Sequence, residues 1–334
     1  MKVLFRLNAG KKTGLGHLAR NVALALEMSK RDIAFNFLIK CDDSVIVENF
    51  LRTFALDISN VCFISEGTDS ESDISLIRKY LNPISDFLII DHYDHDLLYQ
   101  KKLKESGIKW AQFDYETSKQ IFANVVVNSN VCAQSELYKH LVSDNARLCV
   151  GPEYAIIREE FLQKKIRPIK NSILIALGGA NYPEEVIELI KYIVRFTGYT
   201  FNIVSRDLKL KELLIGLENV NLYINENNVY PIYVRNEVAI VAGGVTTYEL
   251  AVLDIPMFIV PYVENQLPNA QAWHKKFCGI NYEAILHFRN ELALEGLGKM
   301  ISQLQEKYLN RTVKIDGKGA VRIVNEILKA MNDE

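Results

Sequence analysis

Short apolar runs alternate along the chain with segments of helical periodicity, and this alternation most limits the folds available to it. The runs are continuously apolar, as in Phe87–Ile90, which is typical of parallel strands buried on both faces. Strands that alternate with helices predict an α/β fold whose parallel sheet is covered on both sides. In the first half we expect strands at Val3–Arg6, Ala34–Ile39, Val61–Ile64, Asp86–Asp91, Lys109–Phe113, Asn124–Val127 and Arg147–Val150.

The same alternation starts again after a polar, proline-containing connection around residues 158–170. A chain of 334 residues is longer than one core usually supports. We therefore expect two Rossmann-like domains, residues 1–165 and 166–334, which face each other across a cleft. The second domain should contain strands at Ile173–Leu177, Phe201–Val204, Val220–Ile224, Val238–Val241 and Met257–Val260, and late helices at Glu291–Tyr308 and Ala320–Met331.

Composition narrows the function classes. The formal net charge is −2 and the basic residues are scattered, which argues against a nucleic-acid partner. The five cysteines form no Cys-x-x-Cys pair, so neither a zinc site nor a disulfide framework is indicated. No apolar run approaches membrane-spanning length, and we expect no signal peptide. We expect a cytoplasmic chain without a membrane partner, and its oligomeric state stays open.

Two glycines and a histidine, in the stretch Gly14–Arg20, open the first predicted helix. Leu18, Val22 and Leu26 form one apolar stripe after them. The first turn of a helix has unpaired N–H groups and a positive dipole end, so His17 should stay neutral near pH 7 and could accept a proton. The alternative is a capping loop with an incidental surface histidine, because Gly-x-Gly is weak without a full fingerprint.

The segment Asp91–Asp96 directly follows the buried run Phe87–Ile90 and is rich in aspartate and histidine. In open α/β sheets, ligands bind beyond the carboxyl ends of the strands, which favours a polar lining of the ligand site. The spacing matches no recognised metal-ligand pattern. Capping of the next helix by Asp94 or Asp96 is the alternative without a ligand.

Paired glycines follow two predicted strands of the second half, at Gly178-Gly179 and Gly243-Gly244. Glycines before a helix allow the backbone to approach a phosphate closely, and a helix N-terminus favours anions. Neither pair is part of a Walker P-loop or of Gly-x-Gly-x-x-Gly, so a nucleotide-sugar fits better than an NTP or a nicotinamide dinucleotide. Both pairs could instead simply permit tight strand–helix corners.

Two further polar places complete the candidate set. Glu249, in the helix that follows Gly244, could bind ribose hydroxyls or could simply favour the helix N-terminus. Asn265 and Gln266 lie in a polar loop after the strand Met257–Val260, and amides both donate and accept hydrogen bonds, as sugar recognition requires. That loop could equally be an ordinary helix-capping loop.

Taken in order, these motifs resemble the PseG/SpsG family of nucleotide-sugar hydrolases, which is related to the MurG-type glycosyltransferases of the GT-B fold. The resemblance runs over roughly the first 280 residues. It is carried by Met1–Arg6, Gly14-Leu15-Gly16-His17-Leu18-Ala19-Arg20, Ile89-Ile90-Asp91-His92-Tyr93, Phe113-Asp114, Gly151-Pro152-Glu153-Tyr154-Ala155-Ile156-Ile157-Arg158-Glu159-Glu160-Phe161, Leu177-Gly178-Gly179-Ala180, Gly243-Gly244-Val245-Thr246-Thr247-Tyr248-Glu249 and Val263-Glu264-Asn265-Gln266.

The resemblance implies hydrolysis of UDP-2,4-diacetamido-2,4,6-trideoxy-β-L-altropyranose to UDP and a free sugar for pseudaminic acid synthesis, with no cofactor and no metal. It implies that His17 is the catalytic base and that Tyr93 and Asn265 are catalytic residues that line the sugar site. The residues expected to bind substrate are Arg6, Asn8, Gly14, Gly16, Arg20, Asp91, His92, Gly178, Gly179, Gly244, Val245, Thr246, Glu249 and Gln266. One departure is Asn8, because the family usually has aspartate at this position.

Two other functions fit the same residues. A MurG-like glycosyltransferase would also use a UDP-sugar donor but would need an acceptor site. A non-catalytic nucleotide-sugar binding protein would need no base, so the presence of His17 counts against it. Product analysis with the purified protein separates the three.

Overall fold

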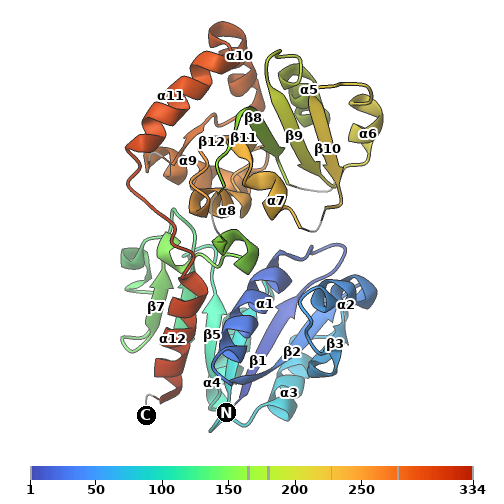
Figure 1. Ribbon diagram of the computed structural model, residues 1–334. Helices are drawn as coiled ribbons and strands as arrows, with labels where there is room; N and C mark the ends of the chain where they lie inside the picture. The colour runs from blue at the N-terminus through green and yellow to red at the C-terminus, as the bar shows by residue number, and fades with distance from the viewer. Residues whose placement is uncertain (1, 164–165, 179–180, 227, 277, 333–334) are drawn as a thin grey trace. The chain divides into compact units, whose positions relative to one another are not determined.

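The computed structural model describes residues 2–163, 166–178, 181–226, 228–276 and 278–332. They form two compact units, and each is considered by itself (Figure 1). Unit 1 comprises residues 1–158 together with 317–334, and unit 2 comprises residues 159–316. No helix in the part of the chain that the structure describes is long and apolar enough to cross a membrane.

Unit 1 is built on a seven-stranded parallel sheet with the strand order β3-β2-β1-β4-β5-β6-β7. All seven strands expected from the apolar runs are present. Their bounds are β1 Lys2–Asn8, β2 Ala34–Cys41, β3 Val61–Ser65, β4 Phe87–Asp91, β5 Lys109–Phe113, β6 Val125–Asn128 and β7 Arg147–Val150. Every residue of β4 and β6 is buried, as strands covered on both faces require.

Helices cover both faces of this sheet. The bounds are α1 Gly16–Ser29, α2 Ser44–Arg52, α3 Ser70–Tyr80, α4 Leu97–Glu105 and α12 Gly319–Asn332. One core cluster joins Val3 and Phe5 to apolar residues of α1, α2 and α12. The other joins Leu4 and Trp110 to residues of α3 and α4. The alternation along β1 therefore assigns its side chains to two separate cores.

The last helix differs from the expected division into residues 1–165 and 166–334. Helix α12 packs with unit 1, beside α1 and against β5, β6 and β7 (Figure 1). Its buried residues Ile323, Val324 and Ile327 belong to the same core cluster as β1. The sequence shows that the helix has an apolar face but not which sheet that face covers, so chain order gave the wrong partner.

Unit 2 has a six-stranded parallel sheet with the order β10-β9-β8-β11-β12-β13. The strands are β8 Ile169–Ala176, β9 Thr200–Ser205, β10 Val220–Ile224, β11 Asn236–Val241, β12 Met257–Ile259 and β13 Gly279–Asn281. The helices are α5 Glu184–Ile193, α6 Lys209–Leu213, α7 Tyr230–Tyr233, α8 Thr246–Val252, α9 Leu267–Lys275, α10 Ile285–Glu295 and α11 Leu297–Leu309.

The segment expected as one helix, Glu291–Tyr308, is part of two helices. Gly296 separates α10 from α11 with φ +76°, a left-handed conformation that an α-helix does not continue through. The strand β13 was not expected either, because its three residues are too short to show a pattern.

In each sheet the strand order reverses once, and the loops of interest lie at the reversal. In unit 1 the chain runs outward from β1 through β2 to β3, and then continues on the other side of β1 with β4. In unit 2 the corresponding point lies between β8 and β11. Ligands of open α/β sheets bind beyond the carboxyl ends of the strands at such points. The strand order thus brings the loop after β1 close to the end of β4, and the loop after β8 close to the end of β11.

Candidate active site

The loop between β1 and α1 is closed by a bridge between two glycines and held by the carboxylate of Asp42. Gly10 and Gly14 form an isolated antiparallel bridge. Asp42, just after β2, accepts hydrogen bonds from the backbone N–H groups of Lys11 at 2.8 Å and Lys12 at 3.1 Å. A Cβ atom on Gly10 would lie 1.8 Å from Oδ1 of Asp42, so only glycine fits there. Two N–H groups that could have bound a phosphate are thus already occupied.

His17 lies in the first turn of α1, as expected, and faces the end of β4. Its Nδ1 atom is 2.7 Å from Oδ1 of Asp91. The His17 residue is 8% exposed, whereas Asp91 is fully buried. The fold therefore brings together two residues that are 74 positions apart in the chain.

The carboxylate of Asp91 is saturated with donors from unit 1. Arg20 donates to both of its oxygens, at 2.6 Å from Nε to Oδ2 and through Nη2 to Oδ1. Asn21 Nδ2 donates to Oδ2 and the Tyr115 hydroxyl donates to Oδ1, both at 2.5 Å. Burial would raise the pKa of Asp91, but the charge of Arg20 and the hydrogen bonds from His17 and Arg20 outweigh it and lower that pKa below its ordinary value. Asp91 is therefore ionised near neutral pH and can only accept.

Because Asp91 is an acceptor only, the short contact assigns the tautomer of His17. Arg20 Nη2 also lies 2.9 Å from Nδ1, but its two protons are taken by Asp91 Oδ1 and the Tyr115 hydroxyl. A lone pair on Nδ1 facing a carboxylate oxygen at 2.7 Å would be repulsive, so in a neutral ring we assign the proton to Nδ1. The lone pair of the imidazole then lies on Nε2. An acceptor nitrogen oriented by a buried carboxylate is the arrangement of a general base.

Aromatic rings surround the imidazole. Tyr93, which is 66% exposed, meets it edge-to-face with ring centroids 5.2 Å apart. Tyr115 lies 5.0 Å from Tyr93 and 6.1 Å from His17, measured between ring centroids. The Arg20 guanidinium stacks over Phe113 at 4.5 Å and over Tyr115 at 5.1 Å. Tyr93 therefore presents an exposed aromatic face next to the candidate base.

Arg6 and Asn8 belong to a polar network on the other side of β1. Arg6 is 1% exposed, and its Nε atom donates to Asp73 Oδ1 at 2.7 Å. Its Nη1 atom donates to Asn8 Oδ1 at 2.8 Å, and Asn8 Nδ2 donates to Asp94 Oδ2 at 3.2 Å. Arg6 thus holds the Asn8 side chain in place. The amide donates to Asp94, a contact that an ionised aspartate at position 8 could not make.

His92 is fully buried and lies away from any exposed surface. Its Nδ1 atom accepts from the backbone N–H of Asp94 at 3.1 Å, while Nε2 has no hydrogen-bond partner among the described residues. Burial lowers the pKa of His92 well below its ordinary value, and the nearby Arg6 charge acts in the same direction. Asp96 caps α4 by accepting from the N–H of Tyr99 at 2.8 Å. The side chains of His92 and Asp96 therefore hold the nearby backbone in place, and Tyr93 is the one ring of this segment that is exposed.

The two glycine pairs of unit 2 differ in what surrounds them. Gly178 has φ +72°, a left-handed conformation, and Gly179 lies outside the described residues. A Cβ atom on Gly243 would lie 2.6 Å from the backbone oxygen of Gln266, whereas one on Gly244 would meet nothing within 4 Å. Gly243 therefore permits a close approach of the loop that carries Asn265, and Gly244 leaves open space.

Helix α8 begins directly after this open space. Thr246 is its first residue, Val245 is exposed, and Glu249 is buried in its first turn. Thr247 is held by its own hydroxyl, which donates to the Gly244 carbonyl at 2.7 Å and accepts from Trp273 Nε1 at 2.9 Å. The start of α8 is thus tied to α9.

The loop after β12 carries two of the expected residues. Asn265 is exposed, and Gln266 Oε1 accepts from the backbone N–H of Tyr262 at 3.3 Å. The Tyr262 hydroxyl donates to the Leu177 carbonyl at 3.1 Å. This loop therefore lies beside the residues that precede Gly178.

Within unit 1 the structure brings together His17, Arg20, Asp91 and Tyr93. Within unit 2 it brings the loops of Gly178, Gly244 and Gln266 together. Sequence reasoning missed Asn21, Asp42 and Tyr115. Asn21 and Tyr115 each lie one residue beyond a quoted motif, which ends at Arg20 and at Asp114 respectively, so extension of those motifs would have included them. Asp42 carries no comparable signal.

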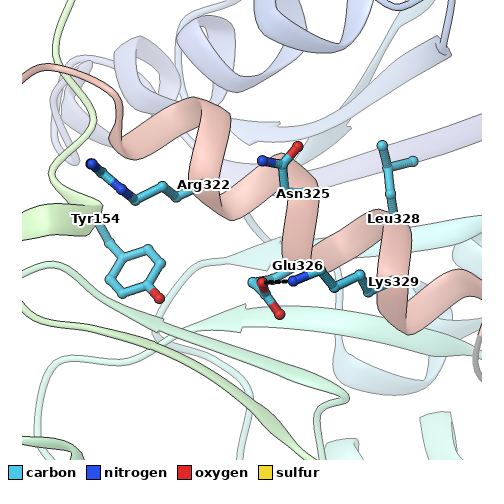
Figure 2. Close-up of a pocket in the computed structure, with 6 residues that line it drawn as sticks. All are labelled: Tyr154, Arg322, Asn325, Glu326, Leu328 and Lys329. Carbon is cyan, nitrogen blue, oxygen red and sulfur yellow. Dashed lines mark hydrogen bonds and ion pairs between the residues drawn. The ribbon is translucent and has the colours of Figure 1, made fainter.

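A groove on α12 is a poor candidate for a ligand site. It has a volume of about 370 Å³ and is lined by Tyr154, Arg322, Asn325, Glu326, Leu328 and Lys329. Figure 2 shows that Glu326 and Lys329 bind each other, at 2.6 Å, and Glu326 also pairs with Arg147 at 3.1 Å. Among the described residues, no group of three or more His, Cys, Asp or Glu side chains is placed to hold a metal ion.

Comparison with known proteins supports the expected relationship. The chain is 28% identical over 289 residues to the UDP-2,4-diacetamido-2,4,6-trideoxy-β-L-altropyranose hydrolase of Campylobacter jejuni, which covers 85% of this chain and all of that protein. It is 20% identical over 337 residues to the spore coat polysaccharide biosynthesis protein SpsG of Bacillus subtilis, covering 95% and 94% of the two chains. The predicted resemblance is confirmed. No protein-family model matches the chain.

Among solved structures, MurG from Acinetobacter baumannii superposes with a TM-score of 0.65 at 14% identity, over 98% of this chain and all of that one. At this identity the match shows the fold alone, and the α/β, GT-B-like class is confirmed. The similarity to the PseG/SpsG proteins supports an enzyme that processes nucleotide sugars.

Proposed function

We propose that the protein hydrolyses a UDP-linked 2,4-diacetamido-2,4,6-trideoxy hexose to UDP and the free sugar, as a step of pseudaminic (nonulosonic) acid biosynthesis. The observation that carries the proposal is the 2.7 Å contact between His17 and the donor-saturated Asp91, which leaves Nε2 as a proton acceptor. The similarity to the Campylobacter UDP-sugar hydrolase supports the substrate class.

In the proposed reaction, a water molecule attacks the anomeric carbon while Nε2 of His17 takes one of its protons. The new C–O bond replaces the bond between the anomeric carbon and the β-phosphate oxygen, so UDP leaves with the electron pair of that bond. Tyr93 and Asn265 are proposed to line the sugar. The backbone around Gly178 and Gly244, the start of α8 and Glu249 are proposed to hold the nucleotide and to accommodate the leaving-group charge.

The test follows UDP release from this nucleotide-sugar in water enriched in ¹⁸O. Attack at the anomeric carbon places the label in the free sugar, and attack at phosphorus places it in UDP. We expect label in the sugar only, and a kcat for His17→Ala that is lower by about 10²-fold or more. His140→Ala, which removes an exposed histidine of the same unit, serves as the matched control and should keep full activity.

Three results would refute the proposal. Equal rates for the native protein and His17→Ala would remove His17 from the mechanism. Transfer of the sugar to an added acceptor, with no free sugar formed, would favour the glycosyltransferase alternative. Tight UDP binding without turnover would favour a binding protein.

A further inference from the structure

Tyr115 contacts the same carboxylate as His17 but comes from a different part of the sheet. It lies two residues after the end of β5, whereas Asp91 ends the neighbouring strand β4 and His17 lies in α1. Its hydroxyl is 2.5 Å from Oδ1 of Asp91, the oxygen that also faces His17 Nδ1. Three segments of unit 1 therefore meet at one carboxylate oxygen.

The direction of the Tyr115 hydrogen bond follows from its second partner. Arg20 Nη2 contacts the same hydroxyl oxygen, and a guanidinium can only donate. The phenol oxygen must therefore accept from Arg20, and its own proton is left for Asp91. Arg20 thus fixes both the charge of Asp91 and the direction in which Tyr115 donates.

From this geometry we infer that Tyr115 is a positioning residue. It acts through Asp91, whose carboxylate it orients so that Oδ1 receives the Nδ1 proton of His17 and Nε2 is left as the acceptor. The inference extends the proposed function, and it rests on that function only in the test that measures kcat. A Tyr115 hydroxyl occupied by Arg20 and Asp91 has no further proton to give to a substrate.

The test uses Tyr115→Phe, which removes the hydroxyl and keeps the ring that packs against Tyr93. Tyr99→Phe is the matched control, because Tyr99 is a buried tyrosine of the same unit whose hydroxyl also donates to a carboxylate, Asp73 Oδ2, at 3.1 Å. Circular dichroism and thermal unfolding of each variant establish that it is folded before comparison.

The first readout is independent of turnover. Proton–nitrogen NMR of protein labelled in its six histidines, assigned with His17→Gln, should show a low-field Nδ1–H signal for His17. We expect this signal to move upfield or to broaden in Tyr115→Phe and to stay in place in Tyr99→Phe. An unchanged signal in Tyr115→Phe would overturn the inference, whatever its activity.

The second readout is steady-state hydrolysis. Tyr115→Phe should lower kcat by about tenfold or more, since hydrogen bonds to charged groups are among the stronger ones, while KM stays within about twofold. In an Asp91→Asn background the same change should have little further effect, because both substitutions act on one contact. Additive losses would overturn the inference. If Tyr115→Phe shows the NMR effect but the native protein hydrolyses no UDP-sugar, positioning by Tyr115 is supported and the proposed function is refuted.

Discussion

The Nδ1 atom of His17 and the Oδ1 atom of Asp91 lie 2.7 Å apart at the point where the strand order of unit 1 reverses. The contact links the first turn of α1 to the last residue of β4. Because Asp91 is fully buried and surrounded by donors, it is unavailable to a ligand and serves His17 instead. The carboxylate that sequence reasoning assigned to substrate binding is better described as the residue that orients the base.

Asp91→Asn should therefore impair catalysis rather than substrate binding. An asparagine can present its NH₂ group to His17, which would move the ring proton from Nδ1 to Nε2 and remove the acceptor. We expect kcat to fall by about 10²-fold with KM little changed, measured by UDP release. Native kcat in a folded Asp91→Asn protein would show that the tautomer of His17 is set by something else.

The clamp between Asp42 and the loop before α1 gives a second prediction. Gly10→Ala should expel the Asp42 side chain and also strain the loop backbone, since the added Cβ would lie 1.8 Å from Oδ1 and the φ of Gly10 is +156°. Asp42→Ala removes the same two hydrogen bonds without adding a group. Both variants should lose hydrogen-exchange protection at the Lys11 and Lys12 amides and should have lower kcat, because the loop leads into the turn that carries His17.

Gly16→Ala is the folding control for this pair. A Cβ atom there would meet nothing within 4 Å, and alanine favours a helix over glycine by up to about 1 kcal/mol. Its loop amides should remain protected. Unchanged protection in Gly10→Ala would mean that Asp42 does not hold the loop.

Burial of His92 predicts a pH dependence of stability. Its pKa lies well below the ordinary value in the folded protein, whereas the unfolded chain has a pKa of about 6.5. Below that pH the unfolded state binds the proton more readily, so the free energy of unfolding should fall as the pH drops from about 7 to 5. The contribution is fully present above the unfolded pKa.

His92→Asn should flatten this slope, because an asparagine keeps an acceptor for the Asp94 N–H but does not titrate. Urea unfolding at a series of pH values measures the effect. His140→Asn, at an exposed position, should leave the slope unchanged. A slope that survives in His92→Asn would assign it to other groups, such as His95, whose pKa burial also lowers.

Continuous apolar runs predicted all seven strands of unit 1 because most of their residues are buried or partly buried, and burial is recorded in composition. The loop motifs predicted His17 and Tyr93 because a glycine-rich turn and a strand end are local features. The role of Asp42 depends on which strands become neighbours in the sheet, and the partner of α12 depends on a contact between distant segments. Such tertiary contacts have no local pattern, which is why sequence reasoning missed them.

Helix α12 should stabilise unit 1 specifically. Ile327→Ala removes a fully buried side chain from the cluster that includes β1 and α1, so we expect a loss of about 2–5 kcal/mol. Trp110 lies in unit 1 and Trp273 in unit 2, and they are the two tryptophans of the chain. Fluorescence of Trp273→Phe and Trp110→Phe backgrounds therefore reports each unit separately.

Only the Trp110 signal should shift to lower denaturant in Ile327→Ala. Leu309→Ala, at a side chain that is 80% exposed, is the control and should change neither signal. A shift of the Trp273 signal alone would show that α12 stabilises unit 2 instead, and would contradict the prediction.

The neighbouring glycines Gly243 and Gly244 allow a direct test of nucleotide binding in unit 2. Gly243→Ala places a Cβ atom 2.6 Å from the backbone oxygen of Gln266, so it should displace that loop and lower stability. Gly244→Ala meets no protein atom within 4 Å and should fold like the native protein. If a diphosphate approaches the backbone there, the added methyl group should nevertheless weaken UDP binding by about tenfold or more, since close backbone approach is what glycine permits. Calorimetric titration with UDP measures the affinity. Gly216→Ala is not suitable as a control variant, because φ is +80° at Gly216 and alanine would be strained there. Native UDP affinity in Gly244→Ala would leave Gly244 as a turn residue and move the nucleotide site elsewhere.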